Sequence, residues 1–173
     1  DEIYAKLVYD GQQHVSIARL GDDIQRLTLC VDGLSKSSSM TGWRIGYCAV
    51  PKEIATVVGR IQSHSTPNPN TPAQWASIAA LTGPDTAIND MRASFVERRN
   101  IMVKRLNTIP GISCLTPQGA FYAFPNISGV FGKVSSSGPI TDSVLFCKYF
   151  LKEKLVACVP GSGFGAEGYI RLS

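Results

Sequence analysis

The sequence predicts an α/β fold followed by a smaller α+β unit, and three features support this prediction. Two β-prone runs, Thr28–Val31 and Ile45–Val50, flank a serine-rich turn. Apolar residues then recur at three- and four-residue intervals, which is typical of an amphipathic helix. Beyond residue 107, short β-prone runs surround one further helix. With 173 residues and 44% hydrophobic content, the chain is long enough to bury a core.

The first long helix is predicted over residues 51–65, because proline suits a helix start and an apolar stripe follows it. We expect this stripe to pack on the preceding strand; it consists of Ile54, Val57, Val58 and Ile61. After a proline-rich break, Thr71 is predicted to cap a second helix that has Pro72 at its first position and runs to about Thr82.

A longer helix is predicted over about 85–107, with its apolar residues on one stripe. About 23 residues would span roughly 35 Å, which is long enough to connect two domains. We therefore expect domains at residues 1–90 and 91–173, joined by this helix. The second domain is expected to contain a helix from Asp142 to Lys154. Its strands are expected near residues 112–115, 120–124, 156–159 and 169–172.

Composition argues against several classes of protein. The formal net charge is +4, without a long basic run, so nucleic-acid binding is not implied. No stretch approaches the roughly 18 apolar residues that a membrane span requires. The five cysteines are odd in number and mostly lie in apolar runs. We expect them to be reduced core thiols of a cytoplasmic protein.

Three other kinds of site find no support in the sequence. His14 and His64 have no cysteine or carboxylate cluster near them, which argues against a metal site. Neither histidine lies in a context typical of a serine hydrolase. The glycine-rich segment Gly161–Gly168 leads into a predicted strand, whereas a dinucleotide-binding turn must lead into a helix.

The most informative segment is Ser35–Tyr47, which places Lys36 in a turn of small residues eight positions before Arg44. Both side chains are expected to project from a connection between two strands, where functional sites are common. Such a pair suggests an amine that does chemistry beside a guanidinium that holds an anion. On spacing alone, a solvated lysine and an ordinary ion-paired arginine are the commoner explanation.

The order of residues in this segment, Ser-Lys and then Met-Thr-Gly-Trp-Arg-Ile-Gly-Tyr, resembles the cofactor-lysine segment of the class I aminotransferases. These enzymes of the aspartate aminotransferase family use pyridoxal 5′-phosphate. Four more patches resemble the family in the same order, namely Asp1–Tyr4, Asn70–Trp75, Gly119–Tyr122, and Val159–Ser162 together with Tyr169–Ser173. The second of these resembles the bacterial aspartate-specific branch.

The resemblance implies part of a fold type I pyridoxal-phosphate-dependent transferase. Residues 1–90 would be the C-terminal portion of its three-layer αβα large domain, and residues 91–173 its small α+β domain. The match covers less than half of a subunit, so we expect the chain to be a C-terminal fragment. Three N-terminal contributions to the cofactor site would then be missing, namely the ring-stacking aromatic residue, the phosphate-binding turn and the asparagine that bonds the phenolic oxygen. We therefore expect the isolated fragment to be inactive.

The resemblance also implies roles for residues of the cofactor segment. Lys36 would bind the cofactor aldehyde as an aldimine and carry the proton between substrate and cofactor as the general base. Arg44 would hold the cofactor phosphate with its planar fork of donors, and Ser35 would donate a hydroxyl to the same group. Many relatives have a phosphate-binding serine three places before the lysine, where this chain has Gly33.

Three residues outside that segment also receive roles by resemblance. Asp1, at a strand end, would bond the pyridine nitrogen, and Tyr4 would reach the phenolic oxygen. The alternatives are a frayed terminal carboxylate and an ordinary core tyrosine. Arg171 lies in an apolar strand and needs an anionic partner. The resemblance makes that partner the substrate α-carboxylate, and a structural ion pair is the alternative.

The implied function is transamination between an amino acid, expected to be aspartate, and a 2-oxo acid, expected to be 2-oxoglutarate. The family implies a homodimer, with small-molecule substrates and neither nucleic acid nor membrane as partner. One alternative is a sister enzyme that acts on prephenate, aromatic or branched-chain amino acids, or a C–S lyase. Another is the non-catalytic aminotransferase-like domain of a transcription regulator.

Overall fold

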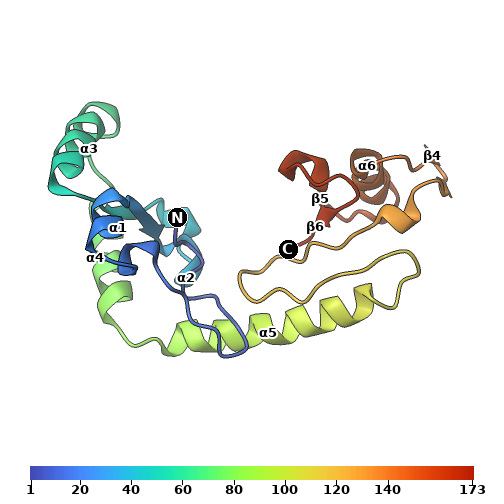
Figure 1. Ribbon diagram of the computed structural model, residues 1–173, viewed down its shortest axis with the longest axis horizontal. Coiled ribbons are helices and arrows are strands. Elements are labelled where there is room, and N and C mark those ends of the chain that lie inside the picture. Colours follow the sequence, from blue (N-terminus) through green and yellow to red (C-terminus); the bar gives the residue numbers. More distant parts are fainter. The chain divides into compact units, whose positions relative to one another are not determined.

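The computed structural model describes residues 1–173 and divides into two compact units, Asp1–Ala93 and Ser94–Ser173 (Figure 1). The elements of the first unit, in order, are the 3-10 helix η1 (Ile17–Arg19), α1 (Asp22–Leu27), β1 (Cys30–Gly33), α2 (Leu34–Ser37), the 3-10 helix η2 (Thr41–Trp43), β2 (Gly46–Ala49), α3 (Lys52–Ser65) and α4 (Thr71–Thr82). Helix α5 (Thr86–Leu106) begins in the first unit and ends in the second.

The two predicted strands of the first unit form one antiparallel pair. Cys30 lies opposite Ala49, and Gly33 lies opposite Gly46. Strand β2 is shorter than the predicted run by one residue at each end, and β1 has the predicted length but begins two residues later than the β-prone run. The connection between the two strands contains α2 and η2, and the pairing of β1 with β2 holds its two ends together.

Helix α3 forms where it was predicted, but the prediction that its apolar stripe packs on the preceding strand is wrong for this chain. No residue of α3 is buried, and its apolar side chains range from 39% exposed at Ile54 to 62% at Ile61. The strands it was expected to cover form a sheet of only two strands, and every residue of β2 is exposed, so this sheet offers little buried surface to the stripe.

Helix α4 has the predicted bounds, but its predicted cap is wrong. The Asn70 side chain caps the helix, because the backbone N–H of Ala73 donates to its Oδ1 at 3.1 Å. Thr71 is then the first helical residue and Pro72 the second. Proline is tolerated there because the first turn of a helix has no intrahelical acceptor for its N–H groups.

The second unit contains the end of α5, then the 3-10 helix η3 (Ser128–Val130), β3 (Val134–Ser135), β4 (Gly138–Pro139), α6 (Ser143–Lys154), β5 (Val159–Pro160), the 3-10 helix η4 (Gly161–Phe164) and β6 (Ile170–Arg171). The strand pairs β3–β4 and β5–β6 are antiparallel. Helix α6 starts where it was predicted, capped by Asp142, whose Oδ1 accepts the Leu145 N–H at 2.8 Å.

The predicted strands near 112–115 and 120–124 are wrong as continuous strands. They form only isolated bridges, Ser113 with Asn126 and Ala123 with Leu172. Pro125 has no N–H to donate, so the pairing that starts at Ala123 and Leu172 is incomplete at the next position, where the Ile170 N–H donates to the Pro125 carbonyl oxygen at 3.2 Å and no bond returns.

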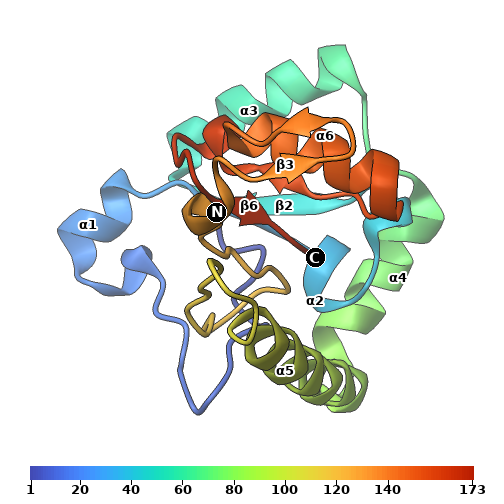
Figure 2. The ribbon, with the colours of Figure 1, turned by 90° about the vertical axis from the view of Figure 1, so that its right-hand side faces the viewer.

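The core of the second unit holds β6 in place. One buried cluster contains Val103, Cys114 and Ala123, and a second contains Ile127, Cys147 and Ile170. Leu172 packs against both clusters. Helix α6 packs on β5. Both elements are labelled in Figure 1, and Figure 2 shows α6 from a second side. The strand that carries Arg171 is thus anchored on both sides of that residue.

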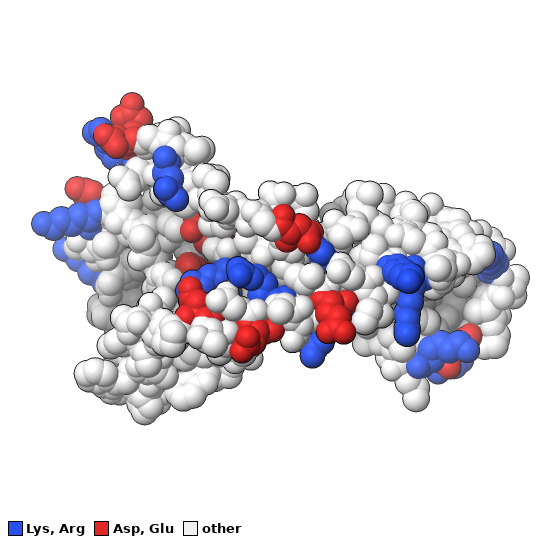
Figure 3. Space-filling model, turned by 90° about the horizontal axis from the view of Figure 1, so that it is seen from below, with Lys and Arg blue, Asp and Glu red and all other residues white.

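Two surface properties complete the description. On the face drawn in Figure 3, acidic and basic side chains lie interspersed. None of the helices is both long enough and apolar enough to span a bilayer.

Candidate active site

Lys36 lies in α2, a single helical turn that follows β1 directly. Leu34 and Met40 are 3% and 7% exposed, so buried side chains fix the turn on both sides of the lysine. Lys36 and Ser35 are both half-buried. The predicted turn of small residues is therefore helical, and small side chains around the lysine leave it room to reach a ligand.

Arg44 ends the same connection in a left-handed backbone conformation, with φ of 52°. Such a conformation costs a non-glycine residue of order 1 kcal/mol and is common at functional sites. The guanidinium is exposed, and one Nη atom donates to the Thr41 carbonyl oxygen at 2.8 Å. This bond turns the planar fork toward the loop and leaves further N–H groups for an anion.

Arg44 lines a cavity of about 690 Å³ in the first unit. Its lining is rich in hydroxyl and amide groups; it includes Ser39, Gln62, Thr66, Asn68 and Asn70. Hydroxyl and amide donors beside a guanidinium form a set of groups that suits a phosphate.

Gly33 leaves little room for a side chain. A Cβ atom there would lie 3.2 Å from the Ile45 carbonyl oxygen and 3.3 Å from the Ile3 Cδ1, so these neighbours would have to move by a few tenths of an ångström. The backbone at Gly33 is extended, so the close approach of β2, and not a special φ, restricts this position. The chain has no serine side chain at this place to contact a phosphate.

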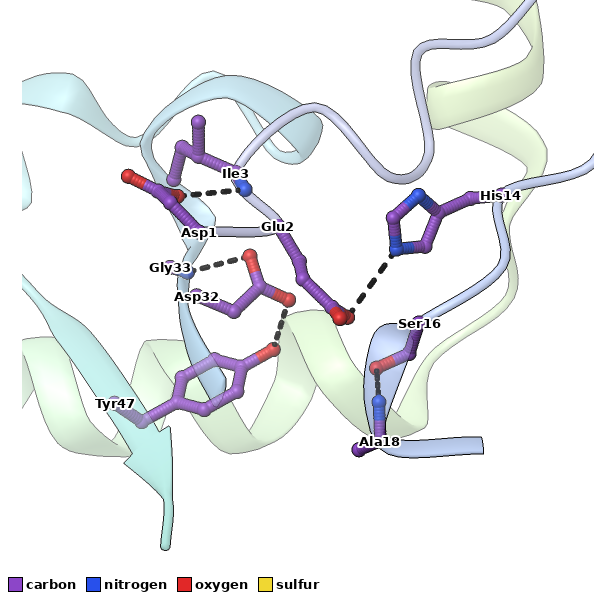
Figure 4. Close-up of polar contacts among 9 residues, drawn as sticks. All are labelled: Asp1, Glu2, Ile3, His14, Ser16, Ala18, Asp32, Gly33 and Tyr47. Atoms are coloured by element: carbon purple, nitrogen blue, oxygen red, sulfur yellow. Dashed lines mark hydrogen bonds and ion pairs between the residues drawn. The ribbon is translucent and has the colours of Figure 1, made fainter. Parts of the chain in front are cut away.

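Asp1 and Tyr4 lie on a segment beside β1 that forms no strand of its own within residues 1–4. A single backbone bond, from Glu2 N–H to the Val31 carbonyl oxygen at 2.8 Å, joins this segment to β1. The Asp1 carboxylate is exposed and accepts the Ile3 N–H at 3.0 Å (Figure 4). Tyr4 is half-buried in the turn that follows.

A pair that the sequence analysis missed lies directly across the two strands. The Tyr47 hydroxyl donates to Asp32 Oδ2 at 2.9 Å, and the Gly33 N–H donates to Oδ1 at 2.6 Å (Figure 4). Burial, with the Asp32 carboxylate second, raises the pKa of Tyr47 to about 12. Asp32 and Tyr47 are register partners, so only the strand pairing, which the sequence does not give, could have joined them.

A second polar group ties the loop before β1 to the N-terminal segment. His14 Nε2 lies 3.3 Å from Glu2 Oε2 (Figure 4). Hydrogen bonding from Ser16, followed by smaller effects of Cys30 and His14, lowers the pKa of Glu2. Burial raises the pKa of the Cys30 thiol. These groups hold the loop in place. The chain contains no cluster of three or more histidine, cysteine, aspartate or glutamate residues that could hold a metal ion.

The cysteines are free thiols, but not all of them lie in the core as expected. Cys114 and Cys147 are buried, Cys30 and Cys158 are half-buried, and Cys48 is exposed. Cys48 lies on β2, all of whose residues are exposed in this chain.

Arg171 lies in β6 with its guanidinium between two aromatic rings. Its Cζ is 4.5 Å from the Tyr122 ring centroid and 5.0 Å from that of Phe164. Its Nε is buried and has no hydrogen-bond partner. A buried N–H without an acceptor costs about 1–3 kcal/mol. No side chain of the second unit accepts this hydrogen bond, so an anionic ligand would be a suitable acceptor.

The loop before Arg171 is held by a residue that the sequence analysis assigned no role. The Glu167 Oε1 accepts the backbone N–H groups of Ser143 at 2.7 Å and of Gly168 at 3.0 Å. These backbone bonds lower the pKa of Glu167. Phe164, on the same loop, packs edge-on against Phe124. The glycine-rich segment thus serves to place Phe164 beside Arg171, and a strand follows it, as predicted.

The structure places five of the six predicted residues in the first unit. Ser35, Lys36 and Arg44 lie on the β1–β2 connection, and Asp1 and Tyr4 lie on the segment beside β1. Arg171 lies in the second unit.

Comparison with known proteins finds aminotransferases that match the whole chain. Residues 1–173 match the family model for aminotransferases of class I and II. The chain is 47% identical over 173 residues to the aspartate aminotransferase of Bacillus subtilis. This match covers all of the chain and 43% of that protein. It is 42% identical to the aspartate/prephenate aminotransferase of Nitrosomonas europaea over its whole length, which is 44% of that protein.

A solved structure agrees. The crystal structure of the aspartate aminotransferase from Rhizobium meliloti matches with a TM-score of 0.95 and 42% identity, over all of this chain and 44% of that one. The predicted fold class, part of a fold type I pyridoxal-phosphate-dependent transferase, is confirmed by such neighbours. The chain spans less than half the length of the relatives it matches, and it belongs to the class I and II aminotransferase family.

Proposed function

We propose that the protein containing this chain transfers an amino group between aspartate and 2-oxoglutarate with pyridoxal 5′-phosphate as cofactor. The observation that carries the proposal is the Lys36 turn, a half-buried lysine among small residues on a connection that also presents the Arg44 guanidinium. Family membership over residues 1–173 and relatives named aspartate aminotransferase support the reaction and the donor.

The residues present fit this cofactor. The cavity beside Arg44 offers a guanidinium, hydroxyl and amide groups, which suits a phosphate, and Ser35 lies on the same connection. Asp1 offers an exposed carboxylate to a protonated ring nitrogen, and Tyr4 offers a phenol to an oxygen on the ring. Bound there, pyridoxal phosphate would supply an electron sink for negative charge that develops at the substrate Cα.

Arg171 would bind the substrate α-carboxylate. Its buried Nε lacks an acceptor, and a carboxylate binds bidentately to the planar guanidinium. The rings of Tyr122 and Phe164 restrict the guanidinium on two sides. Anchoring the carboxylate at a fixed arginine orients the bonds at Cα, which is the main contribution of such clamps to rate.

Lys36 would hold the cofactor and move the proton. Its Nζ would take the proton from the substrate Cα and return it to the other reacting carbon, as a positioned general base. Proton transfer of this kind contributes about 10²- to 10⁴-fold to the rate. The helical turn, held by buried Leu34 and Met40, would restrict the position of that amine.

A second amino acceptor is compatible with the comparisons. The relative from Nitrosomonas europaea is named for both aspartate and prephenate, and prephenate is a 2-oxo acid, so the alternative is amino transfer to prephenate. Assays of the full-length protein with aspartate as donor and either 2-oxoglutarate or prephenate as acceptor separate the two. Faster turnover with 2-oxoglutarate supports our proposal, and faster turnover with prephenate supports the alternative.

We further propose that the full-length protein is a cytoplasmic homodimer that acts on small molecules. The support is family membership. Sedimentation of the full-length protein at micromolar concentration tests the assembly, and cell fractionation tests the compartment. A monomeric species with full activity would contradict the dimer.

The function is tested with the variant Lys36→Ala in the full-length protein. We expect loss of transamination and loss of the absorbance band that the bound cofactor gives the unmodified enzyme. Lys52→Ala, at the exposed start of α3, is the matched control and should retain both. A Lys36→Ala protein with unchanged activity and spectrum would refute the proposal.

A further inference from the structure

The second unit contains two thiols that the proposed reaction does not use. Cys147 lies in α6 and Cys158 lies directly before β5, and their Sγ atoms are 3.3 Å apart. Cys147 is 8% exposed, and Cys158 is half-buried. Both are free thiols in the structure.

The two thiols are held by a packed core. Cys147 clusters with Ile127 and Ile170, and Cys158 packs against this cluster. Helix α6 also packs on β5, the strand that Cys158 precedes. In a disulfide the sulfur atoms are about 2.05 Å apart, so these two must approach by about 1.3 Å. Rotations about the Cα–Cβ bonds of the two residues can supply a movement of this size.

We propose that Cys147 and Cys158 are an oxidative modification site, which hydrogen peroxide converts to a disulfide. First, the Cys158 thiolate sulfur bonds to one peroxide oxygen while the O–O bond breaks. The product is a sulfenic acid on Cys158, and the leaving hydroxide takes up the thiol proton as water. Next, the Cys147 sulfur bonds to the Cys158 sulfur, the S–O bond breaks, and the hydroxyl leaves with the Cys147 proton as a second water. Two thiols are oxidised and one peroxide is reduced.

The environment sets the order of these steps. Burial, and then the hydrogen bond with Cys158, raises the pKa of Cys147 to about 12. Because the thiolate is the nucleophile, Cys147 is a poor first target for peroxide. Cys158 is the more exposed of the two and reacts first. Cys147 is already in contact with Cys158, and this proximity offsets its low thiolate fraction when it attacks the sulfenic acid.

The modification would act on the strand pair that holds Arg171. Val159 follows Cys158 directly and is the register partner of Arg171. A Cys147–Cys158 bond would therefore tie α6 covalently to this pair. The inference does not depend on the proposed function, since it concerns only the thiols and their packing.

The test uses the full-length protein, treated with increasing hydrogen peroxide, alkylated and mapped by peptide mass spectrometry. We expect a cross-linked peptide pair containing Cys147 and Cys158, lighter by two hydrogen atoms and separated by dithiothreitol. Cys114 is the internal reference, because it is buried and its thiol donates to the Leu115 carbonyl oxygen at 3.3 Å. It should remain available for alkylation after unfolding.

Variants test the order of events. In Cys147→Ser, Cys158 should stop at the sulfenic acid, which dimedone traps. In Cys158→Ser, Cys147 should remain a thiol, and Cys114→Ser should form the disulfide as the unmodified protein does. The proposal is overturned if both thiols survive peroxide levels that oxidise them in the urea-unfolded protein. It is also overturned if each is oxidised separately without a cross-link. If a variant does not fold, peptide mapping of the peroxide-treated unmodified protein still decides whether the disulfide forms.

Discussion

Replacing Arg171 with methionine would show whether its guanidinium serves an anionic ligand or the fold. Methionine keeps an unbranched stem and removes both the charge and the buried Nε. The unpartnered Nε costs the folded state about 1–3 kcal/mol. The contacts to the Tyr122 and Phe164 rings return about 0.5–1 kcal/mol each. We therefore expect the free energy of unfolding to change little, between a fall of about 1 kcal/mol and a rise of about 2 kcal/mol.

Activity, by contrast, should fall strongly. A bidentate carboxylate contact consists of two charge-assisted hydrogen bonds, each contributing about 1.5–3 kcal/mol. Losing about 3–6 kcal/mol lowers kcat/KM for aspartate by about 10²- to 10⁴-fold. Arg171→Lys keeps the charge but not the fork, and should give an intermediate loss. The assays are amino transfer to 2-oxoglutarate and urea unfolding, both on the full-length protein.

The matched control is Arg98→Met. The Arg98 guanidinium also lies over a ring, that of Phe95, at 5.9 Å, but it has no proposed ligand. Its kcat/KM should be close to that of the unmodified enzyme. Our reasoning is refuted if Arg171→Met loses several kcal/mol of stability while kcat/KM is unchanged, because Arg171 would then be a structural residue.

Three further predictions concern stability and pH. Ile127 is fully buried, so Ile127→Ala should lower the free energy of unfolding by about 2–5 kcal/mol in urea denaturation, and a loss typical of a surface substitution would contradict this packing. Asn70→Ala removes the cap on the Ala73 N–H and should cost about 1 kcal/mol in the same assay, whereas no loss would show that another group caps α4. The pKa of Tyr47 is raised to about 12, so the stability from its bond to Asp32 should be present below about pH 10 and disappear as the pH rises through 12. Tyrosinate absorbance, compared with that of Tyr47→Phe, measures this titration, and ionisation near pH 10 would contradict the assignment.

Helices with local signals could be predicted from the sequence, and elements that depend on distant partners could not. Helix α4 has the predicted bounds because a proline-rich break and a cap define its start within a few residues. The choice of Asn70 over Thr71 as cap was missed because both side chains can accept the bond. The segments near 112–115 and 120–124 form only isolated bridges, because their pairing depends on residues 126 and 172 and is incomplete at Pro125.

The candidate site divides in the same way. Lys36 and Arg44 could be found because both lie in one continuous segment whose residue order is distinctive. Asp32 and Tyr47 were missed because strand register decides their contact. Glu167 was missed because its partner Ser143 lies 24 residues earlier in the chain. Local sequence therefore predicts the candidate cofactor-binding residues, whereas the residues that hold the surrounding backbone in place depend on tertiary pairing.

The most direct test of the account asks which lysine carries the cofactor. The full-length protein, loaded with pyridoxal phosphate, is reduced with borohydride, which makes the bond between cofactor and lysine permanent, and is then digested and mapped by mass spectrometry. The account predicts that the modified peptide is the one containing Lys36. A cofactor fixed to any other lysine, or to none, would contradict it.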